Sequence, residues 1–358
     1  MHYIYGGVAP GNLLIDHCNF AGNAMHSSSF SNNSILLEDI DCVSSSISNT
    51  VSNGGCVFAN NFSFLNSTCN GNIHQGATIS GGLVCSNSST LDLSSFGNNQ
   101  CKAALQGGLL LAQSQVNVSR SVFSGNNVQA DSIVGAIANG VNADVSASSF
   151  SRNNASSTSV QKGGLFAQSL ALSECYFAEN SAEGALLEGT AVWASSGSIA
   201  STSFSNNVGI SSAHSAVGGA LWLDTSSFSL TDVSFTNNSA DLGGGYSINH
   251  LSVLPVIDNV TMIDNQATAI GNEVFIIGNQ MHSYLQCSEF ILDSGGIQSS
   301  DDCGSSIASL NATKWEKFIW PSQKFEIDLI LVDWFNNMTF NPFYEVSLAP
   351  SPFMSSTV

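Results

Sequence analysis

The chain has 358 residues, of which 43% are hydrophobic and 9% are charged, with 7 Lys plus Arg against 26 Asp plus Glu. The net charge of −19 repels phosphate backbones and anionic lipid headgroups, which argues against nucleic acid as a partner. No apolar run approaches the roughly 20 residues that a membrane helix needs, so we expect membrane contact only through parts outside this chain.

The first residues already carry the spacing of a repeat. Residues 1–12 show neither the basic nor the apolar region of a signal peptide, and Gly6 and Gly7 precede Phe20 by about the interval found later between glycines and aromatic residues. We therefore expect the chain to be part of a longer protein. Residues 24–40 fit the repeat poorly, because Phe30 falls outside the register, and this segment is predicted to be an irregular or looped-out coil.

An aromatic residue followed three places later by asparagine recurs at intervals of 27 residues, with one step of 31. Continuing the period places Met262 after the last member, and Cys69 and Cys42 before the first. A fixed period of this length is typical of a repeat architecture. The members are Phe96–Asn99, Phe123–Asn126, Phe150–Asn153, Phe177–Asn180, Phe204–Asn207 and Phe235–Asn238.

Glycine recurs with the same period, about 15 residues before each aromatic residue. A short apolar run follows each glycine, and then a stretch such as VNADVSASSF, in which apolar and polar residues alternate as in a half-buried strand. The sequence lacks the apolar stripe of a helix. The recurring glycines are Gly54, Gly81, Gly108, Gly135, Gly163, Gly189, Gly218 with Gly219, Gly244 and Gly271.

Three short strands and turns in 27 residues predict one coil of a parallel β-helix, in which equivalent residues of successive coils lie about 4.8 Å apart. The chain is therefore predicted to be all-β, with nine to ten coils over residues 1–290. The phenylalanines should form a continuous buried stack. The asparagines should bond to one another in a ladder and tolerate the left-handed backbone of sharp turns, and the glycines should allow a bend that no Cβ could enter.

The nine cysteines are either buried thiols or disulfides with one left over. Cys42 and Cys69 share a repeat position, so adjacent coils would hold them within disulfide range. Cys287 and Cys303 flank the turn-like stretch DSGGIQSSDD and are a second candidate pair.

Trp193 and Trp222 lie four residues after Gly189 and Gly218, with Ile248 expected next in the column. If exposed, they would form an aromatic strip able to stack on sugar rings. The same column holds apolar residues in earlier coils, which favours an inward stack.

After residue 290 the repeats stop, and residues 291–358 are predicted to be either a cap on the last coil or the start of a β-sandwich-like domain. Within this segment, FEIDLILVDW and TFNPFYEVSL are expected to form two strands around a turn.

The two alternating motifs, Gly-Gly-Ala-Leu at residues 218–221 with relaxed copies elsewhere and Phe-x-x-Asn, resemble those of the chlamydial polymorphic membrane proteins. The resemblance covers about residues 1–290. It implies a right-handed, pectin lyase-like β-helix displayed at the cell surface, at the outer membrane in bacteria, and used in adhesion. From the sequence we expect neither the family's C-terminal translocator barrel nor its export signal in this chain, and a surface protein of a protist fits the repeats equally well.

No group of catalytic side chains converges in the sequence. The cations Arg120, Arg152, Lys102 and Lys162 do not meet an acidic cluster, the histidines share no repeat position, and no cofactor or metal site is predicted. We therefore expect an extracellular or cell-surface adhesion or structural region whose partners are macromolecules or glycans of a host or neighbouring cell. The alternatives are a carbohydrate-active enzyme, since β-helices also host these, and a passive spacer.

Overall fold

In the computed structural model of the chain, β-strands are the only regular elements among the residues that the structure describes. These are residues 13–16, 19–21, 24–26, 36–43, 46–48, 51–53, 57–79, 84–105, 108–224, 227–249, 256–277, 303–305, 307–312 and 329–333. Side-chain contacts come from parts of the range 61–275. The described residues contain no helix of the length and apolarity required to span a bilayer.

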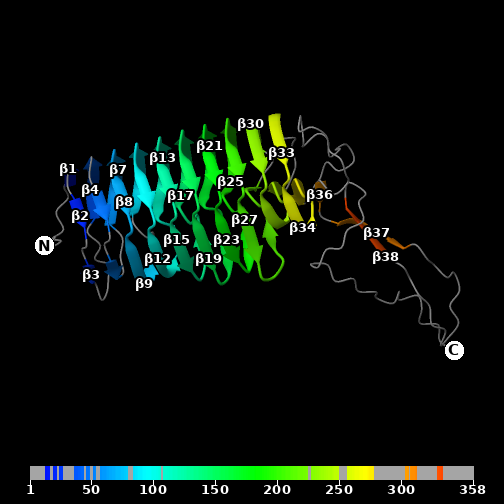
Figure 1. The fold of residues 1–358 in the computed structure, drawn as a ribbon, viewed down its shortest axis with the longest axis horizontal. Coiled ribbons are helices and arrows are strands. Elements are labelled where there is room, and N and C mark those ends of the chain that lie inside the picture. The colour runs from blue at the N-terminus through cyan, green and yellow to red at the C-terminus, as the bar shows by residue number, and fades with distance from the viewer. Residues whose placement is uncertain are drawn as a thin grey trace, which may run out of the picture.

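The chain winds into a parallel β-solenoid, an elongated coil whose strands pair with their equivalents in the coils before and after (Figure 1). One sheet has 22 strands and combines a ladder of long strands with a ladder of three-residue strands. The long strands are β1 (Leu13–Asp16), β4 (Leu36–Val43), β7 (Val57–Leu65), β10 (Val84–Asp92), β13 (Leu110–Ser119), β17 (Ala138–Ser146), β21 (Leu165–Ser173), β25 (Val192–Ala200), β30 (Phe228–Thr236) and β33 (Val256–Ile263). The short strands are β2 (Asn19–Ala21), β5 (Ser46–Ser48), β8 (Thr68–Asn70), β11 (Ser95–Gly97), β14 (Val122–Ser124), β18 (Ser149–Ser151), β22 (Tyr176–Ala178) and β26 (Ser203–Ser205).

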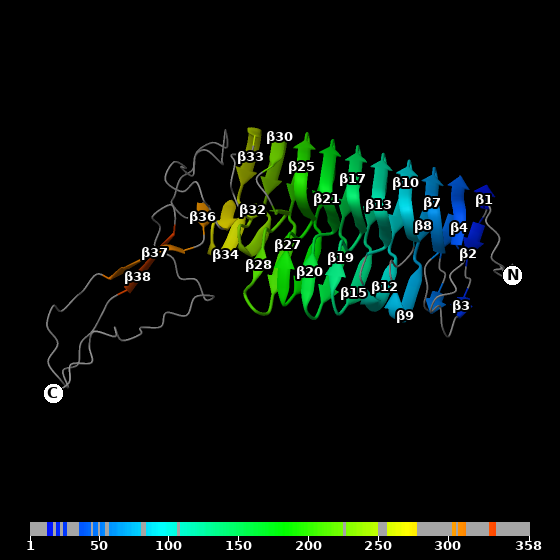
Figure 2. The ribbon, with the colours of Figure 1, turned by 180° about the vertical axis from the view of Figure 1, so that it is seen from behind.

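The same sheet also includes β29 (Leu221–Leu223), β32 (Tyr246–Asn249), β35 (Val274–Ile277) and β36 (Cys303–Ser305). A second sheet of 14 strands forms another wall of the coil, and the two sets of strands run as separate rows along it in Figure 2. Its strands are β3 (Ala24–His26), β6 (Val51–Asn53), β9 (Ile73–Ile79), β12 (Gln100–Leu105), β15 (Asn127–Ala130), β19 (Asn154–Ser157), β23 (Ser181–Gly184), β27 (Val208–Ser211), β31 (Ser239–Leu242), β34 (Gln266–Ile270), β16 (Ile133–Val134), β20 (Val160–Lys162), β24 (Leu186–Glu188) and β28 (Ala216–Val217).

The all-β solenoid predicted from the period is confirmed, but it has about seven turns of about 27 residues rather than nine to ten. Between β7 and β33 six steps are of 27 residues and one is of 31. Parallel pairing continues back to β4 and β1, yet the step from β4 to β7 is only 22 residues, because Cys42 lies opposite Phe64. This shortened step follows the segment 24–40, which departs from the repeat in the sequence.

Among the described residues after 305, one antiparallel pair is formed, β37 (Ile307–Ala312) with β38 (Leu329–Asp333). Strand β38 lies within the predicted stretch FEIDLILVDW, but its partner is β37 and not the predicted TFNPFYEVSL, which lies outside the described residues. The short strand β36 still pairs in parallel with β35, so the solenoid ladder reaches residue 305. The division of the chain at residue 290, and the choice between a cap and a sandwich, stay predictions.

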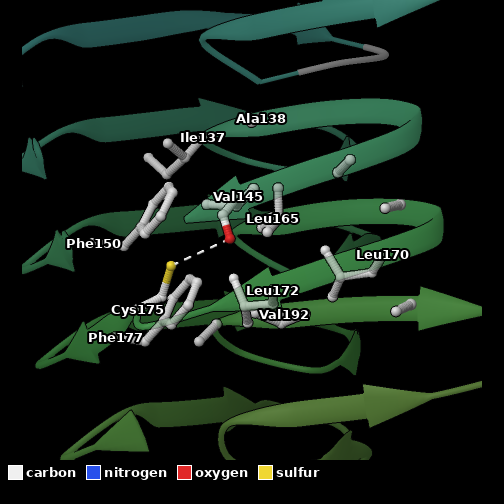
Figure 3. Packing of buried hydrophobic residues seen from close by; sticks show 14 of the residues in the cluster. Ile137, Ala138, Val145, Phe150, Leu165, Leu170, Leu172, Cys175, Phe177 and Val192 are labelled. Carbon is white, nitrogen blue, oxygen red and sulfur yellow. Dashed lines mark hydrogen bonds between the residues drawn. The ribbon is translucent and has the colours of Figure 1, made fainter. Parts of the chain in front are cut away.

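The recurring phenylalanines fill the interior of the coil as one column. From Phe96 to Phe235, consecutive ring centroids lie 4.7–5.1 Å apart with interplanar angles of 3–15°. All six rings in this run are buried, and Met262 continues the column opposite Phe235. Figure 3 shows Phe150 and Phe177 from neighbouring coils with Leu165, Leu172 and Val192 beside them. Because a single coil has no second layer of its own, this stacking provides the apolar burial that each repeat requires.

The asparagines form a second buried column, linked by hydrogen bonds. Each Nδ2 donates to the Oδ1 of the asparagine in the next coil, at 2.8–3.0 Å from Asn72 through Asn238. From Asn99 onwards each Nδ2 also donates to a backbone carbonyl of the preceding coil, as Asn126 does to Phe96 O at 3.0 Å. At the last described member, Asn265 donates instead to Glu273. Glu273 therefore ends the ladder by offering a carboxylate where earlier coils offer an amide oxygen.

The left-handed backbone does not fall on the ladder asparagines, as the sequence had suggested, but on the residue before each one. Asn98 (φ 51°) and Arg152 (φ 53°) precede Asn99 and Asn153, and the position is taken by many residue types. The ladder asparagine points its side chain inward, where its amide bonds to the adjacent coils, and the preceding residue makes the sharp corner. The positive-φ residues of this column are Gly71, Asn98, Gly125, Arg152, Glu179, Asn206, Asn237 and Asp264.

A hydroxyl ladder, which the sequence analysis missed, lines the other corner of the same coils. The backbone N–H of Ser94 donates to Ser121 Oγ at 3.1 Å, and that of Ser121 to Ser148 Oγ at 3.0 Å. The column continues through Cys175 and Thr202, which are joined by a weaker contact of 3.4 Å. The sequence signal was Ser or Thr two places before Phe96, Phe123, Phe150 and Phe204.

The glycine column serves close packing between coils. Gly218 has φ +75°, and a Cβ added to Gly219 would lie 2.0 Å from Gly244 O. Gly108 has the same restriction against Gly135 O, whereas Gly54 and Gly81 lie outside the described residues. The bend thus excludes any side chain, as expected.

Candidate functional site

The outer face of the 22-stranded sheet consists mainly of small polar side chains in straight columns. Asp92, Ser119, Ser146 and Ser173 are consecutive partners in one such column, all half-exposed, and the column continues to Thr231. This arrangement follows from strand geometry, since residues alternate between the two faces and the 27-residue period places like side chains in register. The result is an extended, hydroxyl-rich surface along the coil.

Tyr176 is the one exposed Phe, Tyr or Trp among the side chains that the structure describes, and its residue surface is 46% exposed. It occupies the first position of β22, so strand alternation points it outward while the next residue, Phe177, joins the internal stack. Its partners in the neighbouring coils are Ser149 and Ser203. The sequence signal for Tyr176 was its place directly before the repeat phenylalanine, where most other coils carry Ser or Thr.

A hydrogen bond fixes the direction of the Tyr176 side chain. Ser205, on the next coil, donates its hydroxyl to Tyr176 Oη at 3.2 Å. Because Ser205 pairs with Ala178 and not with Tyr176, the ring must lean diagonally across the sheet to reach it. Ala178 lies on the same outer face and yet is only 4% exposed, which a ring leaning over it explains. The ring is therefore held across the sheet, with nearly half of the residue surface open to solvent.

Two corners with charged side chains border this ring. Glu174 and Glu179 lie on either side of β22 and both have positive φ, so each marks a sharp corner of the coil. Glu179 Oε2 is 3.3 Å from Nε of Arg152 in the preceding coil, and both side chains are well exposed. An exposed pair of this kind contributes little to stability, but it holds a cation and an anion close to the ring.

Trp193 and Trp222, which the apolar residues of their column favoured as buried, are 5% and 4% exposed. They form a small cluster with Val217, Leu242 and Phe275, separate from the main core. Trp193 stacks on Phe166 with ring centroids 4.4 Å apart. The exposed strip is therefore excluded, since neither ring has a free face.

Polar groups close over Trp193 as well. Its Nε1 donates to Glu188 Oε2 at 3.0 Å, and Lys162 Nζ lies 5.0 Å from the ring centroid and 3.0 Å from the same carboxylate oxygen. The column also continues differently from the prediction. Trp222 lies opposite Ser247, and Ile248 lies opposite Leu223, because the coil between them is shorter than 27 residues.

The predicted pairing of Cys42 with Cys69 is wrong. The 22-residue step places Cys42 opposite Phe64 and Cys69 opposite Ile47, so the two do not share a column. Cys69 is buried, and Asn72 Nδ2 donates to its Sγ at 3.1 Å. Of the other candidate pair, Cys303 is placed only by its backbone in β36 and Cys287 lies outside the described residues.

Cys101 and Cys175 are buried free thiols. Burial raises the pKa of Cys175 to about 11 and that of Cys101 to about 12, because the thiolate would lose its hydration. Cys175 Sγ also donates to Val145 O, the dashed line in Figure 3. Both thiols therefore behave as small core side chains and not as nucleophiles.

Three cations of the described residues, Arg120, Arg152 and Lys162, each pair with a carboxylate of an adjacent coil, whereas Lys102 is exposed and forms no ion pair with the described residues. Arg120 forms a bidentate pair with Asp92, and this hydrogen bonding holds the pKa of Asp92 below its usual value. Arg152 makes a single contact with Glu179, from Nε to Oε2 at 3.3 Å. These pairs lie on separate coils, and the described residues bring no two carboxylates and a base to a common point. Nor do they contain three metal-ligating side chains in one group.

No protein-family model matches the chain, and no curated protein or solved structure matches it either. The likeness to polymorphic membrane proteins accordingly stays a prediction, and the fold is assigned from the strand pairing alone.

Proposed function

We propose that this chain is an adhesion or structural region at a cell surface, which binds other macromolecules through the outer face of its 22-stranded sheet. The observation that carries the proposal is that face, an extended array of small polar side chains in register, with one exposed aromatic ring. The buried Phe and Asn columns stabilise the coil from inside, so the outward side chains of the sheet are available to contact a partner. The Gly-Gly-Ala-Leu and Phe-x-x-Asn motifs, which resemble those of the polymorphic membrane proteins, support the same function.

The test is a bead-attachment assay with the full chain. Beads coated with the protein should attach to intact cells, or to extracellular matrix, more than beads coated with an unrelated protein of similar negative charge. The charge-matched control matters because a net charge of −19 by itself changes the behaviour of beads near cells. Attachment equal to that control contradicts the proposal.

The cell-surface assignment is tested separately. Antibodies against the chain should label intact source cells, and external protease should remove the label. Release of sugar fragments from polysaccharides by the purified chain would instead favour the enzyme alternative.

A further inference from the structure

The ring of Tyr176 is presented as a platform. Its hydroxyl accepts a hydrogen bond from Ser205 on the next coil, Ala178 on the same sheet face is 4% exposed, and Tyr176 itself is 46% exposed. An aromatic face carries partial negative charge and attracts partially positive C–H groups, so a ligand with a flat set of C–H bonds suits it. Because the hydrogen bond already fixes the side chain, little conformational entropy is lost when a ligand stacks on it.

The cross-strand neighbours of the ring carry hydroxyls. Ser149 and Ser203 flank it at the spacing of neighbouring coils, and neither side-chain hydroxyl bonds to another of the described residues. A serine hydroxyl both donates and accepts, which matches a ligand whose groups also do both. A hydrophobic peptide would find no apolar pocket beside this ring, since its cross-strand neighbours are both serines.

The charges near the ring limit the ligand further. Glu174 and Glu179 lie at the two corners of β22, and the nearest cation, Arg152, is already paired with Glu179. An anionic ligand would therefore meet more negative than positive charge, in a chain that is strongly acidic throughout. A neutral ligand with many hydroxyls meets no such repulsion.

From these three features we infer that Tyr176 is the stacking platform of a binding site for a neutral glycan chain. A pyranose ring offers C–H bonds on one face and hydroxyls at its edge, so the ring stacks on Tyr176 while its hydroxyls reach Ser149 and Ser203. The inference rests on the proposed function, because it names the partner of the same sheet face. It also moves the aromatic site away from the buried Trp193 and Trp222.

The experiment titrates the full 358-residue chain with neutral and charged hexasaccharides by calorimetry. The probes are cellohexaose, mannohexaose and chitohexaose, with hexagalacturonate as the anionic comparison. At least one neutral probe should bind, and it should bind more tightly than hexagalacturonate. Tyr176→Ala should weaken that binding about tenfold, because the stacking surface is removed. Tyr176→Phe keeps the ring and should stay within about threefold of the wild-type chain.

Ile210→Ala is the matched control, since Ile210 is also an exposed large side chain but lies on the other sheet, in β27. It should leave binding unchanged. Binding by none of the neutral probes, equal binding by Tyr176→Ala and wild-type chain, or tighter binding of hexagalacturonate each overturns the inference. Circular dichroism of the alanine variant confirms that the coil is intact, as expected for an exposed position.

The bead assay separates this inference from the function on which it rests. If beads carrying Tyr176→Ala attach to cells as well as wild-type beads do, the adhesion role stands and the glycan platform fails. If a neutral hexasaccharide binds through Tyr176 but wild-type beads do not attach, the platform stands and the adhesion role fails.

Discussion

Replacing Asn153 with alanine tests the asparagine ladder at its centre. Asn153 Nδ2 donates to Phe123 O and to Asn180 Oδ1, both at 3.0 Å. Its Oδ1 accepts from the backbone N–H of Asn126 at 3.2 Å and from Asn126 Nδ2 at 2.9 Å. The side chain is buried, so water cannot replace these four bonds without opening the coil.

The expected loss follows from what each partner retains. Asn126 Nδ2 keeps its bond to Phe96 O, and Asn180 Oδ1 keeps its bond from the backbone N–H of residue 153, but the N–H of Asn126 is left buried without an acceptor. The unsatisfied N–H of Asn126 costs about 2 kcal/mol, and each of the other three lost bonds costs about 1 kcal/mol. The free energy of unfolding should therefore fall by about 5 kcal/mol. This is a large part of the stability of a typical domain.

The measurement is urea denaturation followed by circular dichroism. Asn154→Ala is the matched control, because Asn154 is the adjacent residue, exposed, and held by one bond of 3.4 Å to Asn127. It should lower the free energy of unfolding by less than about 0.5 kcal/mol. Asn153→Asp should be at least as harmful as alanine, since it sets a carboxylate against Phe123 O. Equal effects of Asn153→Ala and Asn154→Ala would refute the ladder argument.

Three further predictions concern the core. Gly197→Ala should prevent folding, because φ of Gly197 is +137° and the new Cβ would lie 1.8 Å from Leu170 O. The matched variant Gly97→Ala should still give soluble, folded chain. Equal yields of folded chain from the two variants contradict this prediction. Phe150→Ala should lower the free energy of unfolding by about 3–5 kcal/mol in urea, since it removes one ring from the buried stack, and a loss below about 1 kcal/mol argues against a continuous stack. Burial raises the pKa of the Cys175 thiol from 9.0 to about 11. The buried thiol therefore contributes fully to the free energy of unfolding below pH 9, and this contribution is lost as the pH rises to about 11. Urea midpoints should therefore fall less over this range in Cys175→Ala than in the wild-type chain, and identical falls contradict the assignment.

The errors of the sequence analysis have a common physical source. Counting back by 27 residues placed Cys42 in the column of Cys69. A fixed period aligns two residues only if the coil between them has that length. The coil after β4 is five residues shorter, so the two cysteines are not aligned. The same reasoning put Ile248 in the tryptophan column, where pairing places Ser247. A sequence gives the average length of a coil, whereas backbone hydrogen bonds decide the length of each one.

The sequence alone determined the all-β class, the parallel coil, the stacked phenylalanines and the linked asparagines, because residues one period apart must meet whenever coils of equal length stack. It also contained Tyr176, at an outward position defined by simple alternation. Only the tertiary structure decided which aromatic residues are exposed. Trp193 and Trp222 are covered by side chains from neighbouring strands, while Tyr176 has small serines on both sides and leans onto Ser205. Exposure depends on what the adjacent coils place beside a residue, and that is fixed by the pairing of strands and not by periodicity.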